Sequence, residues 1–375
     1  MTGPRGGAYV HVPFCAHRCA YCSFVAQAGL EGEEAYFDAV AVEALRRAGE
    51  VPGPLETVYF GGGTPSFVPP ERLGLVLAAL RDAFGISGGA EVTVEANPDD
   101  LRDGALEALR RTGASRLSIG VQSLSDAELA PLERRHDAAA ARAALRRAVG
   151  VFRDVSADLM IGIPGQTRES LRASLEGLLE AGVAHVSVYL LEIEKAPRLV
   201  ALRRERPELF ADDDEAAERW ELVDDALARA GLPRYEVSNW AVPGRESRHN
   251  RKYWTQEPTL GLGVAAHSFD GAVRRANTGS LPEYLRRVGA GAAAVVSEVR
   301  LGPAEAVRER ALLGLRLAEG IEEALFSEAS ATASPGDRAR LADAEAAGLL
   351  ERAAGRVRLS RRGVLLSSEV FAALL

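Results

Sequence analysis

The chain has 375 residues and a formal net charge of −8, with 47% hydrophobic and 26% charged residues. That length is enough for about two or three domains with a large buried core. The composition excludes disordered and collagen-like classes, and the negative charge argues against a general nucleic-acid binder. There is no apolar run of about 18 residues and no secretory signal, so we expect a cytoplasmic protein without a transmembrane helix.

The first half of the sequence alternates between short strand-like runs and longer helical stretches. Runs rich in β-branched and aromatic residues predict strands over 8–12, 57–60, 91–96, 116–121, 157–163 and 185–191. Helical spacing predicts helices over 33–48, 70–84, 100–112, 125–149 and 167–181, most of them ending near a glycine at 49, 85, 113, 150 or 182. The alternation predicts parallel βαβ units, which fit either a partial β/α barrel or a doubly wound sheet.

The placement of unusual residues favours the barrel. Cysteines follow the first strand, GGGTP follows the second, and Glu95 and Gln122 end the third and fourth. Glycines and polar side chains at the carboxyl ends of successive strands are typical of the active face of a barrel. We therefore predict an α/β fold built on a partial (β/α)6 barrel.

The pattern changes after residue 212. The stretch 212–231 predicts a helix with an acidic first turn, 233–258 is aromatic and aperiodic, and two or three helices begin near 303. GRVRLS at 355–360 predicts a hairpin arm, and the Ala/Ser/Thr-rich stretch at 326–337 predicts a loop. This resembles a winged-helix module, although a helical cap on the barrel fits equally well. We predict a barrel over 1–245, a connecting segment over 246–302 and a smaller, mainly helical domain over 303–375.

The three cysteines occupy one eight-residue window. Cys15, Cys19 and Cys22 have the spacing C-x3-C-x2-C, and an odd, clustered set is more typical of a metal or catalytic site than of disulfides. Three thiolates can bind three irons of a cubane cluster and leave the fourth iron open. The alternatives are zinc with a histidine such as His17 or His11, although zinc ligands usually form two separated pairs, or reactive thiols.

Other polar residues at the predicted strand ends have two interpretations. Glu95 would be buried, so its carboxylate needs a partner such as a ribose hydroxyl or an ammonium group. Gln122 and Asp158 belong to neighbouring strands of the same predicted face. Each residue alone could be a strand-end cap, but together they predict a binding site.

The cysteine spacing after a first strand resembles the radical S-adenosylmethionine (SAM) superfamily, in which one electron from a [4Fe–4S] cluster splits SAM. The segments AYVHVPFC, GGGTP, VEANP, IGVQS, LERRH and DLMIGIPGQT occur in this order. They resemble the coproporphyrinogen-dehydrogenase-like family over the whole chain. The resemblance implies a SAM site lined by Tyr9, Tyr21, Gly62, Gly63, Thr64, Glu95, Gln122, Arg134 and Asp158. Arg135 is the alternative to Arg134.

Two features separate the branches of that family. The dehydrogenases carry a fourth cysteine two residues after the third, where this chain has Phe24. The segment SRHNRKYW resembles the H-N-x-x-Y-W motif of the heme chaperone branch, HemW, as do Arg275 and Asn277 farther along the chain. The resemblance therefore implies a heme chaperone.

The HNRKYW segment has a physical interpretation for a porphyrin. A histidine can ligate heme iron, and Tyr and Trp offer flat apolar faces, which implies heme-binding roles for His249, Asn250, Tyr253 and Trp254. Arg251 and Lys252 could neutralise propionates. The alternative is a structural aromatic cluster with His249 in the core. His267 is a second candidate iron ligand, although a structural role is also open to it.

We therefore expect a heme chaperone that binds heme, a [4Fe–4S] cluster and SAM and transfers heme to an acceptor hemoprotein. An electron donor to the cluster is a further expected partner, and nucleic acid is not. Peripheral membrane contact and dimerisation are compatible with the sequence. The alternatives are an oxygen-independent coproporphyrinogen III dehydrogenase, whose activity we predict to be absent, and a winged-helix regulator with a sensory cluster.

Overall fold

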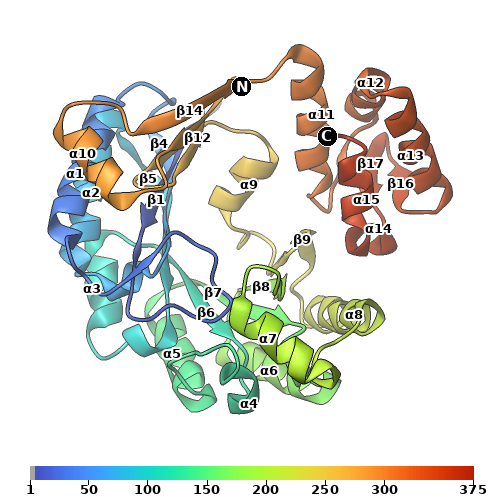
Figure 1. Cartoon of the computed structure of the whole chain (residues 1–375), viewed down its shortest axis with the longest axis horizontal. Helices are drawn as coiled ribbons and strands as arrows, with labels where there is room; N and C mark the ends of the chain where they lie inside the picture. The colour runs from blue at the N-terminus through green and yellow to red at the C-terminus, as the bar shows by residue number, and fades with distance from the viewer. Residues whose placement is uncertain (1–4) are drawn as a thin grey trace.

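The computed structural model describes residues 5–375 and is built around one twelve-stranded sheet (Figure 1). Its strands lie in the order β14 (Val295–Arg300), β13 (Val273–Asn277), β12 (His267–Phe269), β11 (Thr259–Leu262), β1 (Gly7–Val12), β4 (Leu55–Gly62), β5 (Ile86–Ala96), β6 (Arg116–Gln122), β7 (Asp154–Ile161), β8 (His185–Leu190), β10 (Asn239–Ala241) and β9 (Arg234–Glu236).

All six predicted strands are present, as β1, β4, β5, β6, β7 and β8, and they pair in parallel in sequence order. A doubly wound sheet would reverse its strand order at a switch point, so the continuous order is that of the predicted barrel. β11 adds a further parallel strand beside β1, and β12–β14 continue the sheet antiparallel.

The connecting helices bury one apolar face each against this sheet. They are α1 (Glu33–Arg46), α2 (Pro70–Phe84), α3 (Ala105–Thr112), α4 (Asp126–Leu129), α5 (Ala138–Val151) and α6 (Arg168–Ala181). Leu73, Val76 and Leu80 of α2 are completely buried, as expected for residues spaced three and four apart on one helix face. Gly85, Gly113 and Gly182 end their helices with positive φ, as predicted.

The prediction of a single helix over 125–149 was wrong. The chain forms α4 and α5, separated by a loop that contains Pro131, whose ring cannot continue a helix. Asp137 then caps α5 by accepting a hydrogen bond of 2.7 Å from the Ala140 N–H. α5 ends at Val151, one residue past Gly150, so this helix does end near the predicted glycine.

The second half of the barrel region contains α7 (Pro197–Glu205), α8 (Asp213–Arg229), α9 (Arg248–Trp254) and α10 (Leu281–Gly289). α8 is the predicted helix with the acidic first turn, and Asp212 and Glu215 form a capping box at its start. α9 lies in the middle of the molecule, where it contacts both β4 and α11 (Pro303–Leu315) (Figure 1). The aperiodic stretch thus contains a short helix that enters the interior of the barrel.

The C-terminal region has its own small sheet. β15 (Ile321–Glu322), β17 (Arg356–Leu359) and β16 (Leu350–Ala353) pair antiparallel, which confirms the predicted hairpin arm. They pack with α12 (Glu323–Thr332), α13 (Pro335–Ala346), α14 (Arg361–Leu365) and α15 (Ser367–Ala372). The predicted loop at 326–337 was wrong: α12 and α13 cover most of it, because Phe326 and Ala329 are buried in the core. The order of strand, two helices and hairpin is winged-helix-like.

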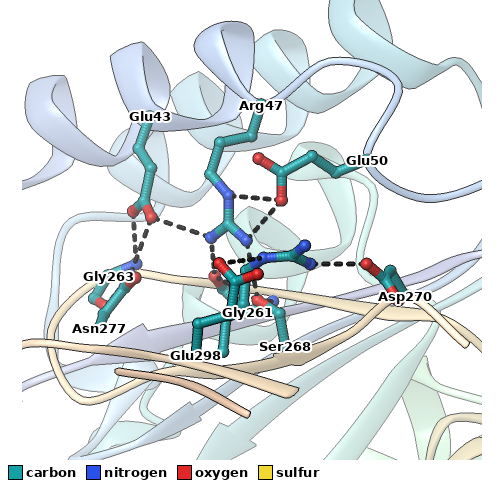
Figure 2. Close-up of polar contacts among 10 residues, drawn as sticks. Glu43, Arg47, Glu50, Gly261, Gly263, Ser268, Asp270, Asn277 and Glu298 are labelled. Atoms are coloured by element: carbon teal, nitrogen blue, oxygen red, sulfur yellow. Dashed lines mark hydrogen bonds and ion pairs between the residues drawn. The ribbon is translucent and has the colours of Figure 1, made fainter. Parts of the chain in front are cut away.

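A buried polar network fastens α1 to the strands that follow α9 (Figure 2). Glu43 accepts hydrogen bonds from the Gly263 N–H at 2.9 Å and from Asn277 Nδ2 at 2.8 Å. Arg47 donates to the Gly261 carbonyl at 2.8 Å and to Ser268 Oγ at 3.0 Å. We call this set of six residues the α1 network; it fixes the backbone of β11 and β12.

Within residues 5–375, none of the helices combines the length and the apolar character needed to cross a membrane.

Candidate functional site

A cavity of about 380 Å³ opens at the carboxyl ends of the parallel strands. We call it the strand-end cavity. Its lining includes all three cysteines and eight of the nine predicted SAM residues: Tyr21, Gly62, Gly63, Thr64, Glu95, Gln122, Arg134 and Asp158. The sequence-based idea of one shared face therefore corresponds to one cavity in the structure.

The cysteine loop starts directly after β1. β2 (Phe14–Cys15) pairs with β3 (Gln27–Ala28), so the loop between them holds Cys19 and Cys22 over the strand ends. The Thr64 hydroxyl donates to Cys15 Sγ at 3.4 Å, and Arg134 Nη1 donates to Cys19 Sγ at 3.3 Å. Burial raises the pKa of the Cys15 and Cys22 thiols, so thiolates here need a bound cation to stabilise them.

The donor arrangement fits a multi-iron cluster better than a single zinc ion. In the described chain, residues 5–375, no three Cys, His, Asp or Glu side chains are placed to hold one metal ion together. His11 is buried and its Nε2 lies 2.8 Å from the Val25 carbonyl oxygen, which leaves it unsuited as a zinc ligand. In a cubane each thiolate binds a different iron, so three thiols around one cavity suffice.

Two carboxyl groups lie deep in the cavity. Burial raises the pKa of Glu95 to about 7, although the Tyr59 hydroxyl donates to it at 2.8 Å and the Gly62 N–H at 3.0 Å. Burial also raises the pKa of Asp158 to about 6, and Ser118 donates to this carboxyl at 3.2 Å. A cationic ligand in the cavity would favour the ionised form of both carboxyl groups, and the two carboxylates would in turn attract its positive charge.

Gln122 carries two signs of a binding position. Its φ is +68°, a strained value for a residue with a side chain, at a bulge between β6 and β7. Its buried Oε1 accepts no hydrogen bond from any group within residues 5–375. A buried, unpaired amide oxygen that lines a cavity is ready to accept a hydrogen bond from a ligand.

Arg134 organises the rim of the cavity. In addition to Cys19 it donates to Asn97 Oδ1 at 2.6 Å and to the Gly120 carbonyl at 2.5 Å. Arg135 instead points away: its side chain is 47% exposed and its Nε lies 3.6 Å from Asp99. The geometry therefore supports Arg134 over Arg135 as the site residue.

The glycines of GGGTP permit close backbone approach. A Cβ on Gly62 would lie 2.4 Å from the His11 ring, and one on Gly63 would lie 2.7 Å from the Val12 carbonyl oxygen. Gly62 also has a φ of +111°, which disfavours other residues. The segment therefore folds flat against β1, and its backbone forms a wall of the cavity.

Tyr9 is the predicted SAM residue that is not part of the cavity lining. It pairs with Tyr59, two residues before the level of Glu95, and the two rings stack with centroids 6.1 Å apart. Tyr59 was missed by the sequence analysis, although its place two residues before GGG put it on the inward side of the strand. It links the strand-end cavity to the barrel interior below.

The predicted heme residues lie apart from that cavity, on α9. His249 is 1% exposed, with Nδ1 2.8 Å from Thr57 Oγ1 and Nε2 2.9 Å from the Tyr253 hydroxyl. Its ring stacks on Tyr59 at 5.2 Å, and burial lowers the pKa of His249 to about 3. Both ring nitrogens are thus engaged, so binding of iron at His249 would require one of these contacts to break.

The other members of the motif occupy different environments. Asn250 is half-buried and donates its backbone N–H to the Ser247 cap, while Tyr253 is 37% exposed. Trp254 packs under the Arg316 guanidinium, 4.3 Å from its ring centroid. Lys252 is buried in ion pairs with glutamates, so it is not a free propionate partner.

A second cavity, also of about 380 Å³, lies beside α9. We call it the α9 cavity. Tyr253 lines it together with His267 and Phe269 of β12, Arg274 of β13, and Glu309 and Leu313 of α11. The HNRKYW segment therefore contributes Lys252 and Tyr253 to a space between the barrel and the C-terminal region.

Phe24 occupies the position at which the dehydrogenase branch carries a fourth cysteine. Phe24 lines the strand-end cavity and is 61% exposed. A phenyl ring at this place supplies neither a thiol for chemistry nor a proton donor.

Comparisons with known proteins agree with this geometry. Residues 9–189 match the radical SAM superfamily model, and residues 301–366 match the HemN C-terminal domain model. The chain is similar to the heme chaperone HemW of Mycobacterium tuberculosis, with 38% identity over 100% of this chain and 96% of that protein. It is also similar to the heme chaperone HemW of Bacillus subtilis, with 32% identity over 98% of both chains.

The fold also matches a solved structure. Coproporphyrinogen III oxidase (HemN) from Escherichia coli superposes with a TM-score of 0.85 over 99% of this chain and 90% of that one, at 23% identity. This match establishes the barrel and the C-terminal region as a common fold. The full-length relatives show that the chain belongs to the HemW family of the radical SAM superfamily.

Proposed function

We propose that this protein is a heme chaperone that binds a [4Fe–4S] cluster and SAM in the strand-end cavity and passes heme to acceptor hemoproteins. The observation that carries the proposal is the full-length similarity to proteins named heme chaperones. In this assignment the barrel holds the resident cofactors, and the segment 246–302 contributes to the site for the cargo.

The strand-end cavity supports the cofactor part of the proposal. Cys15, Cys19 and Cys22 supply the soft donors that an iron–sulfur cluster needs, and the cluster would supply one-electron chemistry when bound. Glu95 and Asp158 would compensate the positive charge of SAM, and Gln122 Oε1 would accept a hydrogen bond from it. Arg134 would hold the cluster loop in place.

The alternative function is oxidative decarboxylation of coproporphyrinogen III, which the shared fold with HemN leaves open. Phe24 argues against this activity, because the dehydrogenase branch of the family that the chain resembles has a cysteine at this position. We therefore expect no dehydrogenase activity, with the exposed ring of Phe24 in the place of that thiol.

One experiment separates the two functions. The full chain is reconstituted anaerobically with iron and sulfide, and heme transfer to apomyoglobin is measured beside turnover of coproporphyrinogen III in the presence of SAM and a reductant. We expect heme uptake and transfer, and no protoporphyrinogen. Protoporphyrinogen formation would instead identify a dehydrogenase, and failure to take up heme would refute the chaperone proposal.

A further inference from the structure

The histidines of this chain differ sharply in their availability to a ligand. There are six in the sequence, and all six lie within the described residues. Four are buried with at least one ring nitrogen hydrogen-bonded: His11, His136, His185 and His249. The two exposed histidines are His17, in the strand-end cavity, and His267, in the α9 cavity.

The α9 cavity combines polar and charged lining residues with a wall of aromatic and aliphatic side chains. Its volume of about 380 Å³ lies within the usual range of roughly 300–1,000 Å³ for small-molecule sites. Tyr253 and Phe269 present aromatic rings, Leu313 adds an aliphatic wall, and the His267 imidazole is available in the same space. An imidazole beside aromatic surfaces is the donor set that binds heme iron.

From these observations, and resting on the proposed chaperone function, we propose that heme binds in the α9 cavity with His267, and not His249, as its axial ligand. The assignment reconciles two facts. The H-N-x-x-Y-W segment contributes to a heme site through Tyr253, while its histidine stays in the core, bonded to Thr57 and Tyr253.

The fold holds His267 rigidly on the cavity side of β12. A Cβ on Gly261 would lie 2.1 Å from the His267 carbonyl oxygen, so only a glycine lets β12 lie this close to β11. The next residue, Ser268, also borders the cavity, and its hydroxyl bonds to Arg47 and to the Gly261 N–H (Figure 2). The α1 network that anchors Ser268 therefore also holds the backbone of His267 beside the cavity.

The charged residues of the cavity lining offer little attraction to heme propionates, so the bond between His267 and the heme iron would contribute much of the affinity. Its two cations, Lys252 and Arg274, are ion-paired with Glu257 and Glu309 respectively. The four charges sum to zero, so heme propionates would meet no unpaired cation among these lining residues. Binding would therefore depend mainly on the axial bond and on contacts with the aromatic rings.

The test uses the full chain and ferric heme, with the Soret band as the readout. His267→Ala should weaken heme binding at least about tenfold and shift the Soret band, because it removes the axial nitrogen. Added imidazole should restore the wild-type Soret position in this variant, an effect that a merely structural role would not produce. His17→Ala, which removes the other exposed histidine, should bind heme like the wild type.

A second variant tests the cavity without touching any histidine. Leu313→Trp on α11 should fill the space and block heme uptake, while iron loading of the cysteines stays unchanged. If the wild type binds heme and His267→Ala keeps its affinity and Soret band, the His267 assignment is overturned while the chaperone proposal stands. If the wild type takes up no heme, the proposed function itself is refuted, and the inference with it.

Discussion

At the scale of single residues, the carboxyl groups of the strand-end cavity make ligand binding depend on pH. Burial raises the pKa of Glu95 to about 7 and that of Asp158 to about 6. The folded state therefore holds protons that the unfolded chain would release, and the carboxylates cost stability as pH rises through this range. A cationic ligand offsets this loss of stability only when the two carboxyl groups are ionised.

We therefore predict that SAM binds more tightly as pH rises from 5.5 to 8. Below pH 6 each group is mostly neutral, and affinity should fall by up to about tenfold per pH unit for each carboxylate that SAM needs ionised. Equilibrium dialysis against cluster-loaded protein measures the effect. Glu95→Gln should bind weakly and lose most of the pH dependence; a flat wild-type profile would show that neither carboxylate faces the positive charge.

Adjacent arginines provide a matched pair for a second prediction. Arg134→Ala removes hydrogen bonds to Cys19, Asn97 and the Gly120 carbonyl, so we expect SAM affinity to fall about 10- to 150-fold, with weaker iron loading. Arg135→Ala removes only an exposed contact with Asp99 and should behave like the wild type. Iron content and SAM dialysis measure both variants, and equal losses in the two would reject the assignment.

At the scale of secondary-structure elements, the sequence predicted the barrel strands but not the loop that carries Arg134. Alanine-rich periodicity runs through 125–149, yet Pro131 and the Asp137 cap divide it into α4 and α5. That break lets the loop residues reach across the strand ends. The periodicity of apolar residues shows which face of a helix is buried, but it does not show where the helix breaks. Here the break depends on the proline ring and the aspartate cap alone, and the strong helix propensity of the alanines around them hides it in the sequence.

The environment of α9 was also beyond reach from the sequence. The motif suggested a ligand role for His249, but the contacts that bury it come from Thr57 and Tyr59 of β4, almost 200 positions earlier in the chain. Gly7 permits the packing, since a Cβ there would lie 2.6 Å from Thr57 Oγ1 and 3.0 Å from Lys252. Such long-range pairing leaves no periodic signal in one sequence.

The α1 network gives a prediction about stability. Glu43 is 3% exposed and accepts hydrogen bonds from Arg47, Asn277 and Tyr284. Arg47 keeps its ion pair with Glu50 in Glu43→Ala, but the buried Gly263 N–H and Tyr284 hydroxyl lose their acceptor. An unsatisfied buried donor costs about 1–3 kcal/mol, so we expect a loss of about 2–5 kcal/mol in the free energy of unfolding. Urea denaturation of the full chain, followed by circular dichroism, measures it.

The control for Glu43 is an ion pair on the surface. Glu218 lies 2.7 Å from Arg168, but both side chains are more than half exposed. Glu218→Ala should therefore change the free energy of unfolding by less than about 1 kcal/mol. Similar values for the two variants would mean that the α1 network does not hold the β11–β13 strands in place.

At the scale of the whole molecule, one sheet carries two separate cavities. The strand-end cavity contains Glu95, whose carboxyl accepts a hydrogen bond from Tyr59. The ring of Tyr59 stacks on His249, and His249 bonds to Tyr253 at the α9 cavity. A packed aromatic column thus fills the barrel interior between the cofactor residues and the proposed cargo site, which keeps the two sites apart.

This separation predicts that heme binding does not require the cysteines, and that cluster binding does not require His267. The triple variant Cys15→Ser, Cys19→Ser, Cys22→Ser should lose iron loading but bind ferric heme within about twofold of the wild type, because none of the cysteines lines the α9 cavity. Conversely, His267→Ala should keep its full iron content and SAM affinity. Heme titration and iron analysis on both proteins test the pair of expectations. Loss of heme in the cysteine variant alone would place the porphyrin at the strand-end cavity, where a substrate would meet SAM, and would favour the dehydrogenase alternative.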